Sequence, residues 1–350
     1  MSINVALLKS ICELPGAPGF EKKIRDFVLE QVSPLVDAVQ VDNLGNVIAI
    51  KRGNRNPENK RVMVAAHMDE IGFIVTHIDD NGFLKFHSLG GFDPKTLTSQ
   101  RVIVHGKKDL IGVMGSKPIH VMSTEEKNKL PKLTDYFIDL GMPKEEVEKY
   151  VTIGDPITRE RELIEMGNCV NCKSIDNRVA VFILIETLKQ LEDPAYDVYA
   201  TFTVQEEVGL RGANVSAHLI NPDFGIALDT TIAYDVPGAS AHEKITELGK
   251  GTAIKIMDAS TICDYRMVAF MKSTAEKFKI KWQPEILTAG GTDTAGVQRM
   301  GKQGSIAGAI SIPTRHLHQV IEMASKEDIH ASIHLLKACL ETLDAYDWKH

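Results

Sequence analysis

Strand-length apolar runs alternate with helical patterns from residue 174 to the end of the chain, and this alternation restricts the fold more than any other feature. Four runs have the length of buried strands, at residues 198–204, 224–228, 252–257 and 306–312. Helical patterns cover residues 176–190, 268–278 and 326–343. Parallel strands need crossover connections of this kind. We therefore predict an α/β fold with a mainly parallel sheet and helices on both faces.

The first 72 residues extend the same pattern. Helices are expected over residues 3–13 and 21–32, and strands over residues 36–41 and 46–51. The next run, residues 62–66, is short and wholly apolar, as in a strand that is buried on both faces. We expect these elements to belong to the same sheet.

The stretch from Phe73 to about Ile164 has a different character. Short alternating segments are separated by turn signals, at residues 73–78, 83–87, 101–105 and 110–114. One short helix is expected, at residues 144–150. We predict that residues 73–164 form a β-rich module inserted into one discontinuous α/β domain, which comprises residues 1–72 and 165–350.

Composition narrows the class of protein. The chain has 43% hydrophobic and 25% charged residues, which is the composition of an ordinary soluble protein. Its net charge of −7 argues against nucleic acid as a partner. No apolar run is long enough to span a membrane. Residues 1–13 are interpreted as an amphipathic helix, since they lack the small-residue cleavage site of a signal peptide. Five scattered cysteines do not indicate a disulfide framework, so we expect a cytoplasmic protein.

Imidazole and carboxylate side chains follow the ends of several predicted strands, and one more carboxylate starts a helix. Ligands of open α/β sheets bind beyond the carboxyl ends of the strands, so these side chains are expected at one edge. Each alone has an ordinary explanation, such as a helix cap or a solvated loop, but their joint placement favours a site. The set comprises His67, Asp69, Asp176, Glu206, Glu207, Asp229 and His318.

Histidine and carboxylate ligands in this number suit two divalent cations with room for a bridging water. The five candidate ligands are His67, Asp176, Glu207, Asp229 and His318. Glu206 is adjacent to a ligand without being needed as one, so it is the candidate general base. Asp69 has the spacing of a carboxylate that orients His67. The chemistry indicated is metal-assisted hydrolysis.

The chain resembles the glutamyl aminopeptidase/tetrahedral (TET) aminopeptidase family of cytosolic dinuclear metallopeptidases. The resemblance covers nearly the whole chain, and its motifs are together highly specific. They are Ala66-His67-Met68-Asp69-Glu70-Ile71-Gly72-Phe73, Asp176-Asn177-Arg178, Gln205-Glu206-Glu207-Val208-Gly209-Leu210-Arg211-Gly212, Ala227-Leu228-Asp229, Gly290-Gly291-Thr292-Asp293 and the run from Pro313 to His318.

The resemblance implies roles for these residues. Asp176 would bridge both metals, His67 and Asp229 would complete one site, and Glu207 and His318 would complete the other. Asp69 would orient His67, and Glu206 would be the base. Zinc is the first expectation for the two metals, with cobalt or manganese as alternatives. The inserted module would support dimerisation, and dimers would assemble into a hollow tetrahedral dodecamer.

One departure from the family pattern lies beside the last ligand. The family usually has Arg-Tyr-x-His-Ser, whereas this chain has Arg315-His316-Leu317-His318-Gln319. His318 keeps the position of the ligand, and His316 places a second imidazole two residues away. His120 in the inserted module is interpreted first as an ordinary loop histidine, with contact to a substrate carbonyl as the alternative, and Asp293 is expected to line the cleft.

The predicted function is that of a dinuclear metalloaminopeptidase acting on peptides with a free N-terminus. A related amide hydrolase, such as a deacylase or dipeptidase, would use the same metal site. A glycanase fits less well, because glycoside hydrolysis usually uses two carboxylates that do not bind metal. A catalytically silent assembly protein is a further alternative, which the intact Glu206 and five ligands oppose. The preferred side chain of the substrate stays open.

Overall fold

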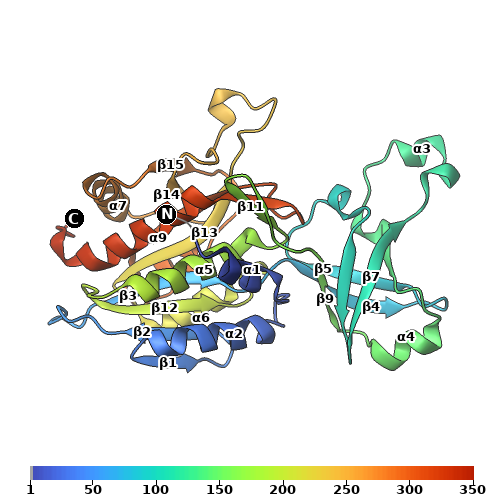
Figure 1. Cartoon of the computed structure of the whole chain (residues 1–350), viewed down its shortest axis with the longest axis horizontal. Coiled ribbons are helices and arrows are strands. Elements are labelled where there is room, and N and C mark those ends of the chain that lie inside the picture. The colour runs from blue at the N-terminus through green and yellow to red at the C-terminus, as the bar shows by residue number, and fades with distance from the viewer. Residues whose placement is uncertain (1–2) are drawn as a thin grey trace.

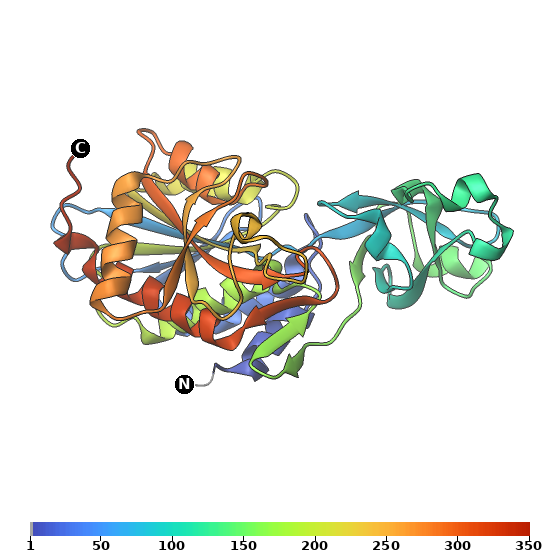
Figure 2. The ribbon, with the colours of Figure 1, turned by 90° about the horizontal axis from the view of Figure 1, so that it is seen from above.

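The computed structural model describes residues 3–350, which form an α/β body and a small β-barrel to one side of it (Figure 1, Figure 2). Met1 and Ser2, which begin the segment interpreted as an N-terminal helix, lie outside the described residues. The mixed α/β architecture with a separate β module agrees with the predicted fold class.

The body is built on an eleven-stranded sheet whose four central strands, β12, β3, β13 and β16, are parallel. Antiparallel strands flank this parallel centre, in the order β1-β2-β12-β3-β13-β16-β17-β11-β10, while β14 pairs with β16 and with β15. The strands are β1 (Ala38–Val41), β2 (Val47–Lys51), β3 (Arg61–His67), β10 (Ile164–Met166), β11 (Cys169–Cys172), β12 (Asp197–Thr203), β13 (Phe224–Ile232), β14 (Thr252–Met257), β15 (Trp282–Ile286), β16 (Ile306–Arg315) and β17 (Glu322–Ser325).

Helices cover both faces of this sheet (Figure 1). One face is covered by α1, α5 and α9, which pack against one another, and the opposite face by α6 and α8. The helices of the body are α1 (Val5–Glu13), α2 (Lys22–Val32), α5 (Ile175–Gln190), α6 (Arg211–Ile220), α7 (Tyr265–Lys277), α8 (Thr294–Arg299) and α9 (Lys326–Thr342), with short 3-10 turns at Ser33–Leu35, Ala241–Glu243 and Leu343–Ala345.

Strand β3 shows why an uninterrupted apolar run suits the centre of this sheet. Successive side chains of a strand point to opposite faces. Val62 and Val64 belong to the core on one face, whereas Met63 and Ala65 belong to the smaller core on the other. A strand buried on both faces has no use for polar side chains until it reaches the edge of the sheet, where His67 ends it.

The smaller unit is a closed antiparallel barrel with the strand order β4-β5-β8-β7-β6-β9. It has a core of its own, in which Phe73 stacks on Phe92 with ring centroids 4.4 Å apart. Its elements are β4 (Gly72–Ile78), β5 (Leu84–Leu89), β6 (Arg101–His105), β7 (Asp109–Ser116), α3 (Thr124–Lys127), β8 (Tyr136–Asp139), α4 (Lys144–Tyr150) and β9 (Pro156–Arg159), with 3-10 turns at Pro94–Leu97, Ile119–Val121 and Leu133–Asp135.

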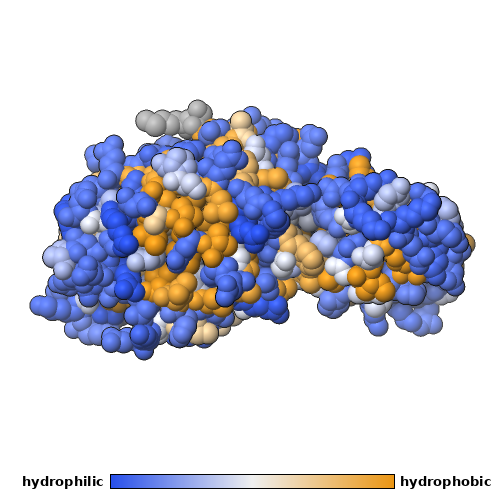
Figure 3. Space-filling view, turned by 90° about the horizontal axis from the view of Figure 1, so that it is seen from below, coloured by the Kyte–Doolittle hydropathy of each residue, from blue (hydrophilic) through white to orange (hydrophobic). Residues whose placement is uncertain are grey.

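The surface is largely polar, with hydrophobic residues gathered in places on both units (Figure 3). On the barrel, large apolar side chains are exposed on β7 and in the segment after it: Ile111, Val113, Ile119, Val121 and Leu130. Among the helices of the described residues, none is long and apolar enough to cross a membrane.

Candidate metal centre

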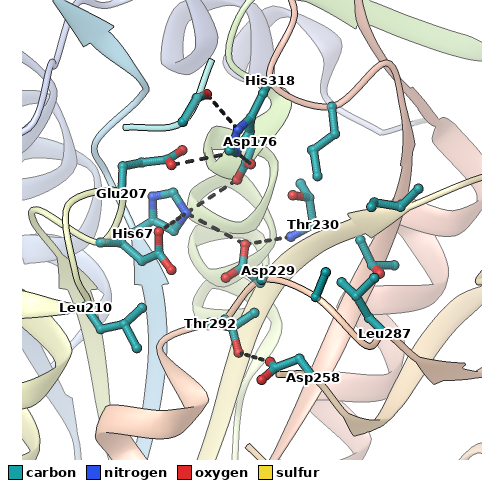
Figure 4. Close-up of a pocket in the computed structure, with 18 of the residues that line it drawn as sticks. His67, Asp176, Glu207, Leu210, Asp229, Thr230, Asp258, Leu287, Thr292 and His318 are labelled. Atoms are coloured by element: carbon teal, nitrogen blue, oxygen red, sulfur yellow. Dashed lines mark hydrogen bonds and ion pairs between the residues drawn. The ribbon is translucent and has the colours of Figure 1, made fainter. Parts of the chain in front are cut away.

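The predicted site residues come together at the carboxyl edge of the parallel strands (Figure 4). His67 is the last residue of β3, and Glu206 and Glu207 follow the end of β12. Asp229 lies on β13 just beyond its pairing with β3, which ends at Ala227. Pairing between the two strands stops there although β3 continues to His67, and the side chains of His67 and Asp229 face each other beyond the last pair at 3.7 Å.

The remaining two candidate ligands approach the same space from other elements. Asp176 stands at the start of α5, where its backbone is not yet helical and the bond to Asn177 is cis. His318 lies in the loop between β16 and β17. The five candidate ligands are therefore supplied by two strand ends, one position within β13, one helix start and one loop.

Asp176 occupies the centre of the cluster. Its Oδ1 lies 3.4 Å from Nε2 of His67, and its Oδ2 lies 3.3 Å from Nε2 of His318. His67 Nε2 is also 3.7 Å from Oδ1 of Asp229, and His318 Nε2 is 3.7 Å from Oε2 of Glu207. The two oxygens of one buried carboxylate thus face two separate groups of ligands.

These residues fit a pair of divalent cations. Ligand atoms of His67, Asp176 and Asp229 lie within 4.8 Å of one another, and so do those of Asp176, Glu207 and His318. Oδ1 of Asp176 is buried and accepts no hydrogen bond. A buried carboxylate oxygen without a donor is costly unless a cation faces it. Imidazole and carboxylate donors also suit zinc and similar metals.

The buried acids and imidazoles of the cluster shift one another's pKa values. Burial raises the pKa of the Glu207 carboxyl to about 8, with Asp176 adding to the rise, and burial raises the pKa of Glu206 well above its usual range. Burial alone would lower the pKa of His318, but Asp176 and Glu207 raise it to about 10. Several carboxylates are buried here beside only two imidazole rings, so the carboxylates repel one another. Bound divalent cations would relieve this repulsion.

Asp69 contributes to the site through two sets of contacts. Nδ1 of His67 lies 3.1 Å from the main-chain oxygen of Asp69 and 3.5 Å from its carboxylate Oδ1. The carboxylate itself accepts the main-chain N–H of Glu206 at 3.0 Å and that of Glu207 at 3.1 Å. The sequence predicted a carboxylate that orients His67. The main-chain oxygen lies nearest to the ring, the carboxylate approaches the same nitrogen at 3.5 Å, and the carboxylate also fixes the loop after β12.

Glu322 is a site residue that the sequence analysis missed. It is fully buried on β17, where its Oε2 accepts the N–H of Asp176 and its Oε1 accepts the N–H of His318, both at 2.9 Å. It therefore fixes the backbone at two candidate ligands, as Asp69 does at Glu206 and Glu207. The sequence did contain one signal for it: Glu322 stands between the apolar residues Ile321 and Met323, close after His318.

A buried ion pair lies behind the loop that carries Asp69. Nζ of Lys173 donates to both carboxylate oxygens of Glu70 at 2.6 Å. Arg178 donates through Nε to the main-chain oxygen of Met68 at 2.6 Å. The Asp176-Asn177-Arg178 motif thus joins the first turn of α5 to the end of β3.

Three other residues singled out in the sequence do not line the cavity at the cluster. His316 is exposed and His120 is exposed on the barrel, and neither lines the cavity at the cluster. Asp293 is buried at the start of α8, where it accepts a 2.5 Å hydrogen bond from Thr203, and it too is absent from the cavity wall. Gly290 and Gly291 of the same motif do line the cavity.

The cluster opens into a cavity of about 560 Å³. One side of the cavity is formed by the candidate ligands and Glu206. The other side is formed by the end of β13, by β14 and by the loop after β15, with Leu317 at the rim. A pocket of this size beside the cluster has room for a small ligand or a side chain of a peptide.

A parallel-centred α/β sheet with such a cluster at its carboxyl edge suits a metal-dependent hydrolase of the α/β class. The chain matches the family model described as M42 glutamyl aminopeptidase over residues 45–335. It therefore belongs to the M42 family, and its activity is that of a peptidase hydrolase of the aminopeptidase kind.

Relatives of nearly full length support this assignment. A putative aminopeptidase of Acetivibrio thermocellus is 39% identical over 94% of this chain and 96% of its own length. Lysyl aminopeptidase of Pyrococcus furiosus is 35% identical over 99% of each chain. Among solved structures, aminopeptidase APDkam598 of Desulfurococcus kamchatkensis is 40% identical with a TM-score of 0.92, covering 96% and 94% of the two chains. Pyrococcus horikoshii TET1 peptidase, which can assemble into a tetrahedron or a large octahedral shell, is 32% identical with a TM-score of 0.84, covering 96% and 98%.

Proposed function

We propose that this chain is an aminopeptidase that uses two divalent metal ions held by five residues. Asp176 would be shared, His67 and Asp229 would complete one site, and Glu207 and His318 would complete the other. The observation that carries this proposal is the position of Asp176, whose two oxygens face the two imidazoles at 3.4 and 3.3 Å. Zinc is the proposed metal, and cobalt or manganese would suit the same donors.

Bound metals of this kind supply a nucleophilic water and polarise the scissile carbonyl. The protein's own contribution is a base at the correct place. Glu206 is buried at the edge of the cavity, and its Oε2 lies 3.8 Å from Nε2 of His67. From this position a carboxylate would take the proton of the water and pass it to the leaving amine. Asp69 holds the N–H of Glu206 and so fixes the position of this base.

The test of this function is Glu206→Gln. The amide cannot take a proton, but the five ligands are unchanged, so we expect two equivalents of metal per chain and a loss of at least about 100-fold in kcat. Metal content is measured by elemental analysis after chelation and re-addition, and activity with a panel of aminoacyl chromogenic amides. Full activity in Glu206→Gln would remove this residue from the mechanism.

The same panel separates the alternative activities. N-acylated amino acids, dipeptides and a β-glucan are assayed beside the aminoacyl amides, with zinc, cobalt and manganese restored in turn. Preference for an acylated amino acid or a dipeptide would identify a deacylase or a dipeptidase. Protein that binds no divalent metal would be neither of these nor the proposed aminopeptidase.

We also propose that the barrel mediates dimerisation and that dimers build a dodecamer. Apolar side chains exposed on it support this: Ile111 is 65% and Val113 is 48% exposed, and both point outward from β7. Native mass spectrometry of Ile111→Lys/Val113→Lys tests the surface, with Glu30→Gln on α2 as a control. A dodecamer that survives the double change would exclude this face of β7 from the interface.

The proposed compartment is the cytoplasm, since all five cysteines are free thiols.

A further inference from the structure

The wall of the cavity opposite the cluster is built by residues that the proposed chemistry does not use. We call this wall the side-chain subsite, and it comprises Thr231, Ile232, Lys255, Asp258, Leu287 and Thr292. Its position next to the proposed catalytic groups is the one that the side chain of an N-terminal substrate residue would reach (Figure 4). The composition of this wall therefore bears on which peptides are cut.

Lys255 is the deepest charged group of the side-chain subsite, and it is already paired. Its Nζ lies 2.6 Å from Oε1 of Glu285 and 3.5 Å from Oδ2 of Asp258, and all three side chains are fully buried. Burial would lower the pKa of Lys255, but Glu285 and Asp258 raise it overall, so the ammonium is retained. A buried charge that is held by two carboxylates is not free to pair with a third.

Asp258 is equally well defined. Its Oδ1 accepts the main-chain N–H groups of Ser260 and Thr261 at 2.9 and 2.8 Å, and the hydroxyl of Ser260 at 2.8 Å. Its Oδ2 accepts the hydroxyl of Thr292 at 3.1 Å. Both oxygens of Asp258 are therefore engaged by hydrogen-bond donors.

The charges of this network leave an excess of one negative charge. Glu285 and Asp258 supply two carboxylates, and Lys255 supplies one ammonium. Among the cavity-lining residues that the structure describes, Lys255 is the only lysine or arginine. An acidic substrate side chain would lose its hydration here without meeting an unpaired cation, which is costly. An uncharged side chain would instead pack against Ile232 and Leu287.

We propose that the side-chain subsite excludes acidic residues, so that this enzyme acts on peptides that begin with uncharged or basic residues. The proposal rests on the aminopeptidase function above and adds a substrate class to it. It also separates this chain from an enzyme selective for N-terminal glutamate, although the family model is named for one.

The matched substrate pair is the 4-nitroanilide of glutamine and that of glutamate, which differ in charge and hardly in shape. With metal restored, at neutral pH, we expect kcat/KM for the glutamine amide to exceed that for the glutamate amide by about 100-fold. The methionine amide, an apolar chain of similar length, and the lysine amide should also be cut faster than the glutamate amide.

Two variants test the cause. Asp258→Asn keeps Oδ1 for its three donors, and its amide donates to Thr292, so the loop keeps its hydrogen bonds. Removal of the excess charge should lower the glutamine-to-glutamate ratio about tenfold. Leu287→Arg adds a cation to the wall and should lower the ratio further. Glu30→Gln, which removes an equal charge from the exposed face of α2, is the control and should leave the ratio unchanged.

The outcomes distinguish this proposal from the function on which it rests. Cleavage of the glutamate amide as fast as the glutamine amide would overturn the subsite proposal and leave the aminopeptidase intact. An unchanged ratio in both variants would show that this wall does not read charge and would also overturn it. Failure to cleave any aminoacyl amide with any of the three metals would overturn the proposed function together with its subsite.

Discussion

Glu322 accepts the main-chain N–H of Asp176 at 2.9 Å, although 146 residues separate the two in the chain. The second oxygen of the same carboxylate accepts the N–H of His318 at the same distance. Glu322 is not itself a candidate ligand, yet it fixes the backbone from which both candidate ligands project. We regard it as a positioning residue of the proposed metal centre.

Glu322→Gln is expected to weaken metal binding by about 10–100-fold. Glutamine offers only one acceptor oxygen, so one of the two N–H groups would face an amide NH₂ and the ligand on that backbone would shift. Metal affinity is measured by competition with a chelator, without reference to activity. The control is Glu276→Gln, a change of the same kind at an exposed position on α7. Equal affinity in the two variants would show that Glu322 only supports the fold.

Asp69→Asn should lower kcat about 10–100-fold. The two N–H groups of Glu206 and Glu207 bind different oxygens of Asp69, so an amide can satisfy only one of them. Steady-state kinetics on the best aminoacyl amide measure the effect. Asp79→Asn in the barrel is the matched control, because Asn81 and Phe83 both donate to a single oxygen of Asp79. A loss of activity no larger than that of the control would refute the positioning role.

The candidate ligands could be predicted from the sequence because each follows a recognisable element. A buried strand is wholly apolar until it reaches the edge of its sheet, so the first polar residues after it, such as His67 or Glu207, mark that edge. The parallel centre of the sheet follows from the alternating helices.

Other parts of the site have no such marker in one sequence. Glu322 acts on residues far away in the chain, and only the folded sheet shows which N–H groups its oxygens reach. Helix α6 (Arg211–Ile220) was not foreseen, because it is short and contains Gly212, a poor helix former. Lys255 was a readable signal, since a lysine inside the apolar strand 252–257 requires a buried partner, but nothing local identifies Glu285 as that partner.

Glu21 should make stability depend on pH. Burial, with Asp69 nearby, raises the pKa of this carboxyl from 4.5 to about 7. The protonated form is therefore favoured in the folded state, and its contribution is complete below pH 4.5 and is lost as the pH rises through 7. Glu21→Gln removes the titrating group but keeps a side-chain oxygen that accepts the main-chain N–H groups of Gly19 and Gln205.

Glu21→Gln is expected to raise the free energy of unfolding by roughly 1–3 kcal/mol at pH 8, with the difference vanishing towards pH 4.5. Urea unfolding at a series of pH values measures this. Glu30→Gln on the exposed side of the same helix should give no such pH-dependent difference. A constant offset between Glu21→Gln and the unaltered protein across the series would contradict the assignment.

The buried pair of Lys173 and Glu70 should behave as a unit. Lys173→Met leaves the Glu70 carboxylate, which is fully buried, with Arg178 at 3.8 Å as its remaining cation. Removal of one partner from a buried ion pair costs about 3–5 kcal/mol of stability, and Arg178 should hold the loss near the lower end of this range. The double variant Lys173→Met/Glu70→Gln removes the charge as well as its partner and should recover most of that loss, as measured by urea unfolding of the metal-loaded protein.

The exposed pair of Lys144 and Asp80 on the barrel is the control for this cycle. Its Nζ–Oδ1 distance is 2.8 Å, but Asp80 is 97% exposed, so water replaces the lost partner. Lys144→Met is therefore expected to leave the stability of the protein nearly unchanged. If Lys173→Met cost no more than Lys144→Met, the Lys173–Glu70 pair would not be needed to hold the loop that carries Asp69. A double variant as unstable as Lys173→Met alone would place the loss in the packing of the lysine chain and not in its charge.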